Sequence, residues 1–419
     1  AFDLRVTRTA ANSTYAGIVR LVEAAQASKA PMARLADQWS LLFLVVTVCL
    51  AFAAWWFTGD PIRAVAVLVV ATPCPLILAV PVALVAGLSR AAHFGVLIKG
   101  AKPLEVLARI RTLILDKTGT LTDGRPQIVS ISAQGDLTED DVLLAAAALD
   151  QASKHPIAQA IVAAALARGL VLPAPENMVE TAGEGMAGTV NGRAVVVGGI
   201  AFVDTHVEGA IPDTDALAAG VVVVAVAIEG RIAGQIVMAD PLREGTEALL
   251  GGLRRFGIAR ILLATGDRRA VAEQVTAGLG LDAVRSELTP DQKVLLVLTE
   301  RKNGPVMMVG DGVNDAPALA AADIGVAMGA RGAAASAEAA DVVLLVDHLD
   351  RLLPGIEIAI GARRIALESV VAGIGLSIMG MIAAALGYLT PVQGAVLQEV
   401  IDVAVILNAL RALRINPKV

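Results

Sequence analysis

Carboxylates that follow short apolar segments are the side chains of this sequence that are best placed to do chemistry. Asp116 ends the apolar part of "RTLILDKTGTLTDG", and Asp311 and Asp315 lie in "VMMVGDGVNDAPAL". A carboxylate at the end of a strand can attack a phosphoryl group and form an aspartyl phosphate. Asp311 and Asp315 offer the hard oxygen ligands that Mg²⁺ prefers, together with substrate phosphate and water. The sequence therefore predicts a phosphoryl-transfer site with Asp116 as its nucleophile.

Two further loops could complete this site. Phosphoryl transfer needs positive charge and in-line positioning more than it needs covalent assistance. Thr265 and Gly266 in "ILLATGD" offer a hydroxyl and a backbone N–H, and Lys293 in "TPDQK" offers a cation. Each of these residues alone could be an ordinary turn residue. Their order along the chain, with each at a strand end or in the following loop, favours one shared site.

The elements that must position these residues alternate between strands and helices. Between residues 90 and 364, short apolar strands end in Gly/Asp loops and are followed by amphipathic helices. This pattern predicts a doubly wound parallel α/β sheet with its site at the carboxyl ends of the strands. Segment 126–235 separates the first strand from the others and has its own hairpin signals, such as the Asn-Gly pair in "TVNGRAVVV". We expect a catalytic domain of residues 90–125 and 236–364 that carries this segment as an inserted α+β domain.

The rest of the chain is unusually apolar. Hydrophobic residues make up 56% of the sequence and the mean hydropathy is +0.69, which is high for a soluble enzyme of this size. A bilayer-spanning helix needs about 20 apolar residues. Four segments approach or exceed this length: 40–57, 64–88, 369–389 and 391–410. Four buried helices of a soluble protein are the alternative, but uncharged runs this long are rare in soluble folds. We expect helix pairs within 40–89 and 365–411.

The distribution of basic residues predicts the orientation of these helices. Eight Lys and Arg residues gather on one side of the predicted spans: Arg34, Arg90, Lys99, Lys102, Arg363, Arg364, Arg411 and Arg414. By the positive-inside rule that side is cytoplasmic. We therefore expect a multi-pass protein of the plasma (inner) membrane whose catalytic domains and both ends, including the tail 412–419, are cytoplasmic. The net charge of −6 gives no reason to expect nucleic acid as a partner.

The second apolar segment contains a cysteine between two prolines. Pro73 and Pro75 flank Cys74 in "VATPCPLILAVP", and prolines leave backbone carbonyls of the preceding turn without donors. Broken helix at membrane depth is tolerated where it lines an enclosed site. A thiolate beside such backbone could bind a metal ion. A structural proline kink around a small apolar cysteine is the alternative.

The fourth apolar segment carries polar groups near its middle. Gln398, Glu399 and Asp402 in "QEVID" are spaced three or four residues apart and are expected to share one helical face. Each charge at mid-membrane costs roughly 2.5–3.5 kcal/mol. A cation held between this face and Cys74 would compensate that cost. The sequence thus predicts a transported cation bound by Cys74, Gln398, Glu399 and Asp402, although chance helix packing remains an alternative.

Three of these motifs together resemble the signature set of P-type ATPases: "DKTGTLT" (116–122), "TGD" (265–267) and "GDGVNDAPAL" (310–319). The resemblance covers the whole chain and implies ATP as phosphate donor and Mg²⁺ as cofactor. It also implies a haloacid-dehalogenase-like phosphorylation domain in which "DPLRE" (240–244) is a hinge segment. The implied catalytic residues are Asp116, Lys117, Thr118, Thr120, Thr265, Gly266, Asp267 and Lys293. The implied magnesium loop contributes Asp311, Asn314 and Asp315, with Asp116 and Thr118 as further ligands.

Thr118 distinguishes this chain from soluble enzymes with the same sheet. Those enzymes use Asp-x-Asp, in which the second aspartate is the acid/base that hydrolyses the intermediate. Thr118 cannot take that role. A phosphoenzyme on Asp116 should therefore persist, as a pump that couples phosphorylation to motion requires.

Two motifs of the inserted segment resemble the adenine pocket of heavy-metal P-type ATPases: "DQASKHP" (150–156) and "GEGMAG" (183–188). A neutral imidazole can stack on adenine, and glycines allow close backbone approach. The resemblance implies nucleotide-binding residues Asp150, His155, Gly183, Gly185 and Gly198. The chain departs from the family pattern at three positions, with aspartate for glutamate at 150, Lys154 before the histidine and Gly199 in place of asparagine.

The "TPCP" and "QExxD" pair resembles one branch of the heavy-metal (type IB) pumps. This branch is implicated in nickel, cobalt or ferrous iron, and zinc, cadmium and manganese stay open. The Cys-Pro-Cys of the copper branch is absent, because Leu76 follows Pro75. A single thiol with carboxylates and an amide suits a borderline divalent ion better than Cu(I). ATP-driven efflux of such a cation is the implied function.

The N-terminal part of the chain, residues 1–39, resembles the exit from an actuator domain into the membrane. No Thr-Gly-Glu loop of that domain is found in the sequence. We therefore expect the C-terminal portion of a pump, with the missing N-terminal half as its partner. A membrane-tethered haloacid-dehalogenase-type phosphatase and a non-transporting half-pump fragment are the alternatives.

Overall fold

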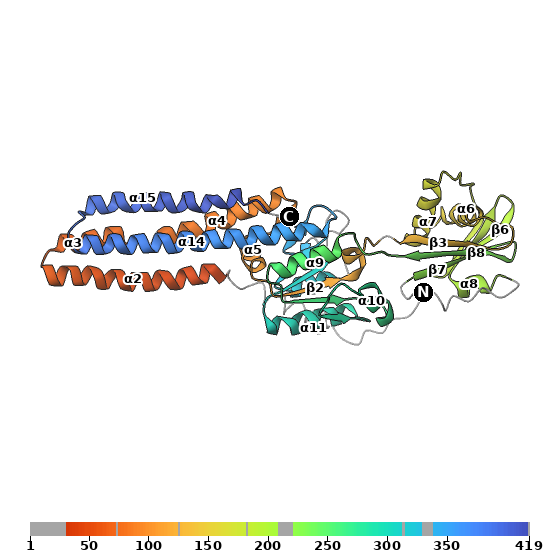
Figure 1. Ribbon diagram of the computed structural model, residues 1–419, viewed down its shortest axis with the longest axis horizontal. Coiled ribbons are helices and arrows are strands. Elements are labelled where there is room, and N and C mark those ends of the chain that lie inside the picture. The colour runs from red at the N-terminus through yellow and green to blue at the C-terminus, as the bar shows by residue number, and fades with distance from the viewer. Residues whose placement is uncertain are drawn as a thin grey trace, which may run out of the picture. The chain divides into compact units, whose positions relative to one another are not determined.

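The computed structural model describes residues 31–72, 74–124, 126–181, 183–207, 221–311, 315–328 and 338–417 (Figure 1). Side chains are described from residue 42 onward, except those of residues 74–76. The chain divides into two compact units. One comprises Ala1–Leu115, Glu247–Leu262 and Leu288–Val419, and the other Asp116–Thr246 and Leu263–Glu287.

Long apolar helices dominate the first unit. They are α2 (Pro31–Thr58), α3 (Pro61–Val70), α4 (Cys74–His93), α14 (Leu352–Ala385) and α15 (Pro391–Ala409). Residues far apart in sequence pack here, since α14 contacts α3, α4 and α15 (Figure 1). A Cβ on Gly87 would come within 2.7 Å of Ala362, so the glycine allows α4 and α14 to pack closely. The Thr390 side chain and Gln393 form a capping box that starts α15.

The second predicted span is two helices rather than one. Helix α3 ends at Val70 and α4 begins at Cys74, so three residues (71–73) separate them. The cause lies in the sequence, since the prolines at 73 and 75 have no N–H to continue the helix. The expected break in this segment is therefore complete enough to separate two helices.

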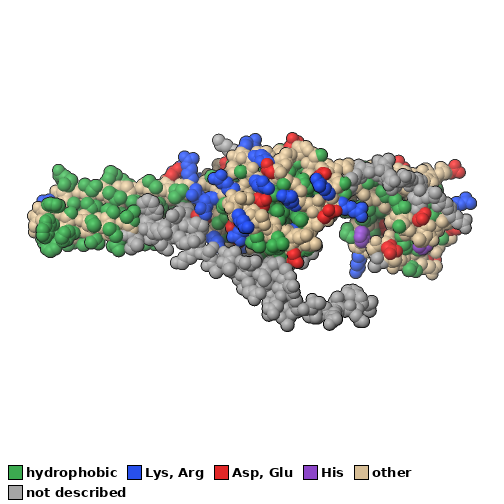
Figure 2. All heavy atoms as spheres, turned by 90° about the horizontal axis from the view of Figure 1, so that it is seen from below, with side chains coloured by type: hydrophobic (Ala, Val, Ile, Leu, Met, Phe, Trp, Pro, Cys, Tyr) green, Lys and Arg blue, Asp and Glu red, His purple; other side chains and the backbone are tan. Residues whose placement is uncertain are grey.

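Hydrophobic side chains cover the outer surface of these helices. Within the described residues, one helical stretch, Leu349–Ala385, is long and apolar enough to cross a membrane, and Leu42–Thr58, Pro61–Val70 and Ile77–His93 are shorter apolar helices. Trp56, Phe57 and Val371 are each more than two-thirds exposed. Figure 2 shows many hydrophobic side chains on the surface at the helical end of the molecule. An exposed apolar surface of this extent is typical of interaction with lipid or another apolar partner.

A seven-stranded sheet carries the predicted catalytic loops. Its strand order is β1-β13-β12-β11-β2-β9-β10, and the neighbouring pairs β13–β12, β12–β11 and β11–β2 are parallel. The strands are β1 (Val96–Ile98), β2 (Thr112–Asp116), β9 (Arg260–Ala264), β10 (Ala283–Arg285), β11 (Val306–Gly310), β12 (Ile324–Ala327) and β13 (Val342–Leu344). The associated helices are α5 (Ala101–Leu107), α9 (Thr246–Arg255), α10 (Arg269–Val275), α11 (Pro290–Glu300) and α12 (Ala316–Ala321). Strands β2 and β11 are buried throughout, as expected for central parallel strands.

The second unit contains a six-stranded antiparallel sheet in the order β3-β8-β7-β6-β5-β4. The strands are β3 (Gln127–Ala133), β4 (Glu176–Thr181), β5 (Gly185–Val190), β6 (Arg193–Gly198), β7 (Val221–Ile228) and β8 (Arg231–Ala239). Helices α6 (Glu139–Asp150), α7 (Pro156–Ala167) and α8 (Ile200–Asp204) accompany them. Asn191 and Gly192 both have positive φ, so the predicted Asn-Gly hairpin turn joins β5 to β6. The α/β sheet with an inserted α+β domain confirms the predicted fold class.

Candidate functional site

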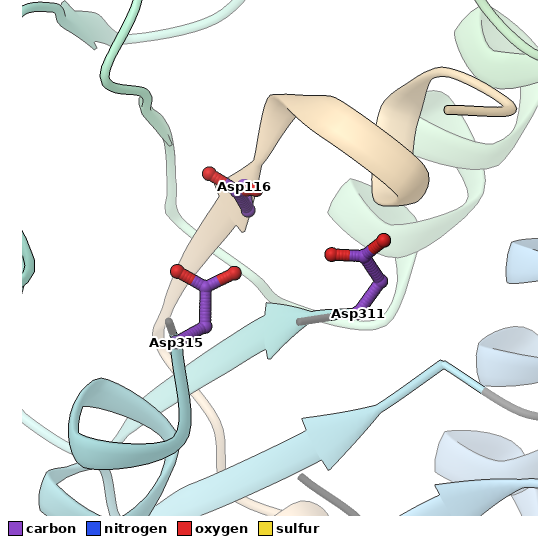
Figure 3. Close-up of side chains that lie close together, drawn as sticks. All are labelled: Asp116, Asp311 and Asp315. Atoms are coloured by element: carbon purple, nitrogen blue, oxygen red, sulfur yellow. The ribbon is translucent and has the colours of Figure 1, made fainter. Parts of the chain in front are cut away.

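Three carboxylates meet at the carboxyl ends of two neighbouring strands. Leu115 of β2 pairs with Val309 of β11 in parallel register, so Asp116 and Asp311 leave the sheet side by side. Asp116, Asp311 and Asp315 each place one oxygen within 4.8 Å of the others (Figure 3). Asp116 is 6% exposed and Asp315 2% exposed. Buried like charges at this spacing repel unless a cation or a proton joins them. The all-oxygen donor set fits Mg²⁺.

A glycine and a lysine hold Asp315 in this cluster. A Cβ on Gly310 would lie 2.8 Å from Asp315 Oδ2, so the glycine leaves room for the carboxylate. Lys293 Nζ donates to Asp315 Oδ1 at 2.7 Å, and both side chains are buried. Thr289 and Gln292 form a capping box at the start of α11, which fixes the helix that carries Lys293. The predicted phosphate-binding lysine is thus held beside the predicted magnesium ligands.

The loop after Asp116 (Lys117–Leu121, η2) is irregular backbone rather than a regular helix. Thr118 is extended, with φ −72° and ψ 129°, and Gly119 has φ 69°. Lys117 Nζ pairs with Asp267 Oδ2, and the Asp267 N–H donates to Thr265 Oγ1 at 3.1 Å. The structure therefore joins the "DKTGT" and "TGD" motifs through a charged pair. Gly266 is exposed between Thr265 and Asp267.

The two threonines of this loop differ in their surroundings. Thr118 is exposed, so it occupies the position of the second aspartate of soluble enzymes without offering a proton-transferring carboxyl. Thr120 is fully buried, and within the described residues its Oγ1 has no hydrogen-bond partner. Buried polar atoms are rarely left unsatisfied. The Thr120 hydroxyl is therefore available to a ligand or to a rearranged loop.

Arg243, whose role the sequence motifs did not predict, contacts the loop that follows Asp116. Its guanidinium donates to the carbonyls of Gly119 and Thr122, each at 3.2 Å, and pairs with Asp123 at 3.3 Å. Asp240 of the same "DPLRE" segment accepts a 2.6 Å hydrogen bond from Thr122 Oγ1. This segment thus holds the loop that follows Asp116. Spacing could not reveal these contacts, because about 120 residues separate the partners along the chain.

The second unit contains a cavity that brings together all five predicted nucleotide-binding residues: Asp150, His155, Gly183, Gly185 and Gly198. His155 caps α7, and its Nδ1 accepts from the Ile157 N–H at 3.3 Å. The neutral imidazole then carries its proton on Nε2. The ring is exposed at the cavity, where it can stack on a planar ligand.

The glycines of this cavity serve close packing as well as access. Gly185 and Gly198 face each other across β5 and β6, and a Cβ on either would collide with the Phe202 ring, at 2.4 and 2.9 Å respectively. Gly183 has φ 81°, a conformation that favours glycine. These positions therefore keep side chains out of the cavity wall whether or not a ligand is bound.

Three carboxylates, those of Asp150, Glu180 and Glu184, line the cavity. Burial, and secondarily the negative charge of Glu180, raise the pKa of Asp150 to about 7. Ser153 Oγ donates to Glu180 Oε1 at 2.9 Å, which orients that carboxylate. Near neutral pH, Asp150 can thus either donate or accept a hydrogen bond.

The long apolar helices of the first unit bring two residues of the predicted metal site, Gln398 and Asp402, into contact. Gln398 is buried, and its Nε2 donates to Asp402 Oδ1 at 2.9 Å and to the Thr72 carbonyl at 3.4 Å. Its Oε1 accepts from Ser377 Oγ at 3.2 Å. The break between α3 and α4 is therefore in contact with the polar face of α15. Glu399 is exposed, and the Cys74 side chain lies outside the described residues, as does Asn314 of the magnesium loop. The assignment of Cys74, Gln398, Glu399 and Asp402 as metal ligands, and of Asn314 to the magnesium loop, stays a prediction.

Comparison with known proteins first defines the catalytic fold. A family model described as haloacid dehalogenase-like hydrolase matches residues 110–323, which include strands β2, β9, β10 and β11 of the seven-stranded sheet and the inserted domain. A crystal structure of a zinc-transporting PIB-type ATPase in the E2.Pi state superposes with a TM-score of 0.80 and 32% identity, covering 98% of this chain and 69% of that one.

Curated relatives extend the match to almost the whole chain. A protein named "Probable copper-exporting P-type ATPase V" from Mycobacterium tuberculosis is 38% identical over 98% of this chain and 55% of its own length. The "Silver exporting P-type ATPase" of Salmonella typhimurium is 37% identical over 97% of this chain and 52% of its own length. The chain belongs to the heavy-metal (type IB) P-type ATPases, which confirms the resemblance seen in its motifs. It spans about half the length of these curated relatives.

Proposed function

We propose that this chain transfers the γ-phosphate of ATP to Asp116 and that the resulting aspartyl phosphate drives transport of a transition-metal cation across a membrane. The observation that carries this proposal is the cluster of Asp116, Asp311 and Asp315 at adjacent strand ends. One Asp116 oxygen attacks the γ-phosphorus as the bond to the ADP oxygen breaks. Lys117, held by Asp267, and Lys293, held by Asp315, place positive charge around the reacting group.

Magnesium fits this scheme as the resident cofactor. Asp116, Thr118, Asp311 and Asp315 would hold it, and it would neutralise phosphate charge during transfer. Exposed Thr118 offers no acid/base carboxyl beside Asp116. The aspartyl phosphate should therefore outlast the intermediates of soluble phosphatases with the same fold.

The cavity around His155 is the proposed adenosine site. Its imidazole would stack on adenine. The glycines of the cavity wall have no side chains, so the adenine ring could approach the backbone closely. Asp150 and Glu180 would meet polar edges of the base. This assignment predicts that His155→Ala weakens ATP binding without removing the phosphorylation chemistry.

The proposed cargo is a heavy-metal cation bound at Gln398, Asp402, the Thr72 carbonyl and Cys74, with Glu399 nearby. The relatives cited above are named for copper, silver and zinc, and these names do not support nickel, cobalt or iron, which the sequence analysis favoured. Among the named metals, oxygen and amide donors suit divalent zinc better than Cu(I) or Ag(I). We therefore place zinc first in a panel that also contains copper, silver, nickel, cobalt, iron, cadmium and manganese.

The proposed location is the plasma (inner) membrane, with several spans and cytoplasmic catalytic domains. Exposed apolar side chains on α2, α3, α14 and α15 support bilayer contact. The direction of transport, efflux, follows the names of the exporting relatives.

Acid-quenched labelling with γ-³²P-ATP and Mg²⁺ tests the central step. We expect a hydroxylamine-labile phosphoenzyme in the unaltered chain and none in Asp116→Asn. Asp136→Asn, an exposed aspartate outside the site, is the matched control and should keep the label. A label that survives Asp116→Asn would refute the assignment of the nucleophile.

A further inference from the structure

Three segments that are distant in sequence converge where the apolar helices end. Arg90 at the end of α4 donates from Nε to the Ile415 carbonyl at 2.7 Å and from Nη2 to Asn416 Oδ1 at 2.5 Å. The chain near Ile415 also packs on α14, since a Cβ on Gly361 would lie 2.9 Å from Ile415 Cδ1. The end of α4, the first half of α14 and the segment after α15 thus form one surface.

This surface concentrates arginines. We call it the arginine surface, and it comprises Arg90, Arg364, Arg411 and Arg414. Arg364 and Arg411 are 79% and 61% exposed and both pair with Glu368, at 2.9 and 3.9 Å. Two of these arginines thus share one carboxylate. Each guanidinium has five N–H donors, so pairing with Glu368 leaves donors for further acceptors.

Exposed leucines alternate with these arginines. Leu367, Leu410 and Leu413 are 37%, 39% and 43% exposed, and they lie within one turn of Arg364, Arg411 and Arg414. Figure 2 shows Lys and Arg side chains gathered where the hydrophobic region of the helices ends. A soluble anion would neutralise the charge and leave the leucines in water. A phospholipid satisfies both, because its phosphate can meet the arginines while its chains cover the leucines.

We propose that the arginine surface binds the phosphate of an anionic phospholipid headgroup, with Leu367, Leu410 and Leu413 against the adjoining acyl chains. This inference rests on the proposed placement of the helices in a bilayer. Its geometry joins the α4, α14 and C-terminal segments, so a bound lipid would tie together the ends of helices that also contribute to the proposed metal site.

The test uses the purified chain in neutral detergent and measures lipid binding by native mass spectrometry. Dioctanoylphosphatidylglycerol, dioctanoylphosphatidylcholine and inorganic phosphate are the three probes. We expect preferential binding of the phosphatidylglycerol. Arg411→Gln/Arg414→Gln should weaken it about thirty-fold, from roughly 1 kcal/mol per arginine near an anionic surface and 1.4 kcal/mol per tenfold in affinity.

Matched variants keep the outcome interpretable. Arg193→Gln/Arg231→Gln removes two exposed arginines from the antiparallel sheet and should leave binding unchanged. Arg411→Lys/Arg414→Lys should retain much of the preference for phosphatidylglycerol. If Arg411→Gln/Arg414→Gln does not fold, the single variant Arg364→Gln replaces it and should also weaken phosphatidylglycerol binding. Equal binding of both lipids, equal loss in the two double Gln variants, or competition by inorganic phosphate at the same affinity would each overturn the proposal.

The proposed enzymatic function can fail independently of this inference. The binding assay contains neither ATP nor a transition metal, so absence of a phosphoenzyme would not alter it. Flotation with phosphatidylcholine vesicles separately tests whether the chain associates with a bilayer. A chain that floats but shows no preference for phosphatidylglycerol would contradict the lipid site alone.

Discussion

The phosphorylation site and the proposed membrane site use carboxylates in opposite ways. At the sheet, Asp116, Asp311 and Asp315 lie within reach of one another, with Lys293 on one side. In the helices, Asp402 accepts from Gln398, which also reaches Ser377 and the Thr72 carbonyl. The first arrangement concentrates negative charge and favours a bound cation. In the second, a neutral amide donates to the Asp402 carboxylate, an arrangement compatible with the proposed binding and release of a cation.

The largest effect should come from removing one carboxylate charge from the cluster of Asp116, Asp311 and Asp315, and it should appear in the Mg²⁺ requirement. Asp311→Asn deletes one of three oxygen-donor carboxylates, so the Mg²⁺ concentration for half-maximal phosphorylation should rise by at least about 100-fold. A magnesium titration of ³²P incorporation measures this shift. Asp402→Asn serves as the control that sharpens the contrast, because it should leave the magnesium requirement unchanged. An equal shift in both variants would break the distinction between the two sites.

A smaller effect is expected from Asp402→Asn, which removes a carboxylate charge from the proposed metal site in the helices. Asn at position 402 can still accept from Gln398, so the helices should stay packed while zinc binding weakens about tenfold or more. Equilibrium binding of ⁶⁵Zn²⁺ to the chain in detergent measures the change, and Cys74→Ala should act in the same direction. Unchanged zinc binding in both variants would mean that the cation binds elsewhere.

Arg243 tests whether the phosphorylation loop depends on support from a remote segment. Arg243→Gln removes the hydrogen bonds to the Gly119 and Thr122 carbonyls, and small displacements of reacting groups are costly. We expect phosphorylation about tenfold slower, with ATP affinity nearly unchanged. Rapid-quench kinetics separates the two quantities, and Arg255→Gln, an exposed arginine of α9, is the matched control. A change in affinity without a change in rate would contradict a positioning role.

The smallest effect concerns a third carboxylate environment, the cavity around His155. The pKa of Asp150 is raised from 3.8 to about 7, so the folded chain binds more protons than the unfolded chain between these values. This contribution to stability is full below about pH 4 and is lost as the pH rises to 7. Asp150→Asn imitates the protonated form and should therefore gain Tm relative to the unaltered chain between pH 5 and 8. A constant difference in Tm across this range would contradict the raised pKa.

The parallel sheet made its part of the site predictable from sequence. Asp116 and Asp311 each follow a buried apolar strand, and the carboxyl ends of adjacent parallel strands meet at one edge. The cavity residues were predictable only through family resemblance, since nothing in the spacing of Asp150, His155 and Gly183 requires them to meet. Collision with Phe202 explains Gly185 and Gly198 independently of any ligand, and this needed coordinates.

Local sequence patterns could not predict contacts between segments that are far apart in the chain. Arg243 reaches the loop after Asp116 because the chain returns from the inserted domain beside it. The helical spacing correctly predicted that Gln398 and Asp402 lie on the same face of α15. Glu399 is one residue further along the helix than Gln398, a rotation of about 100°, and its side chain is exposed. Helical period alone does not specify which side of α15 faces other helices.

The most direct measurement asks where the phosphate is attached. After incubation with ATP and Mg²⁺, borohydride reduction converts an aspartyl phosphate to homoserine, which tandem mass spectrometry can locate in the chain. The account predicts homoserine at position 116, dependent on ATP and on Mg²⁺. Homoserine at another aspartate, or none at all in a chain that hydrolyses ATP, would contradict it.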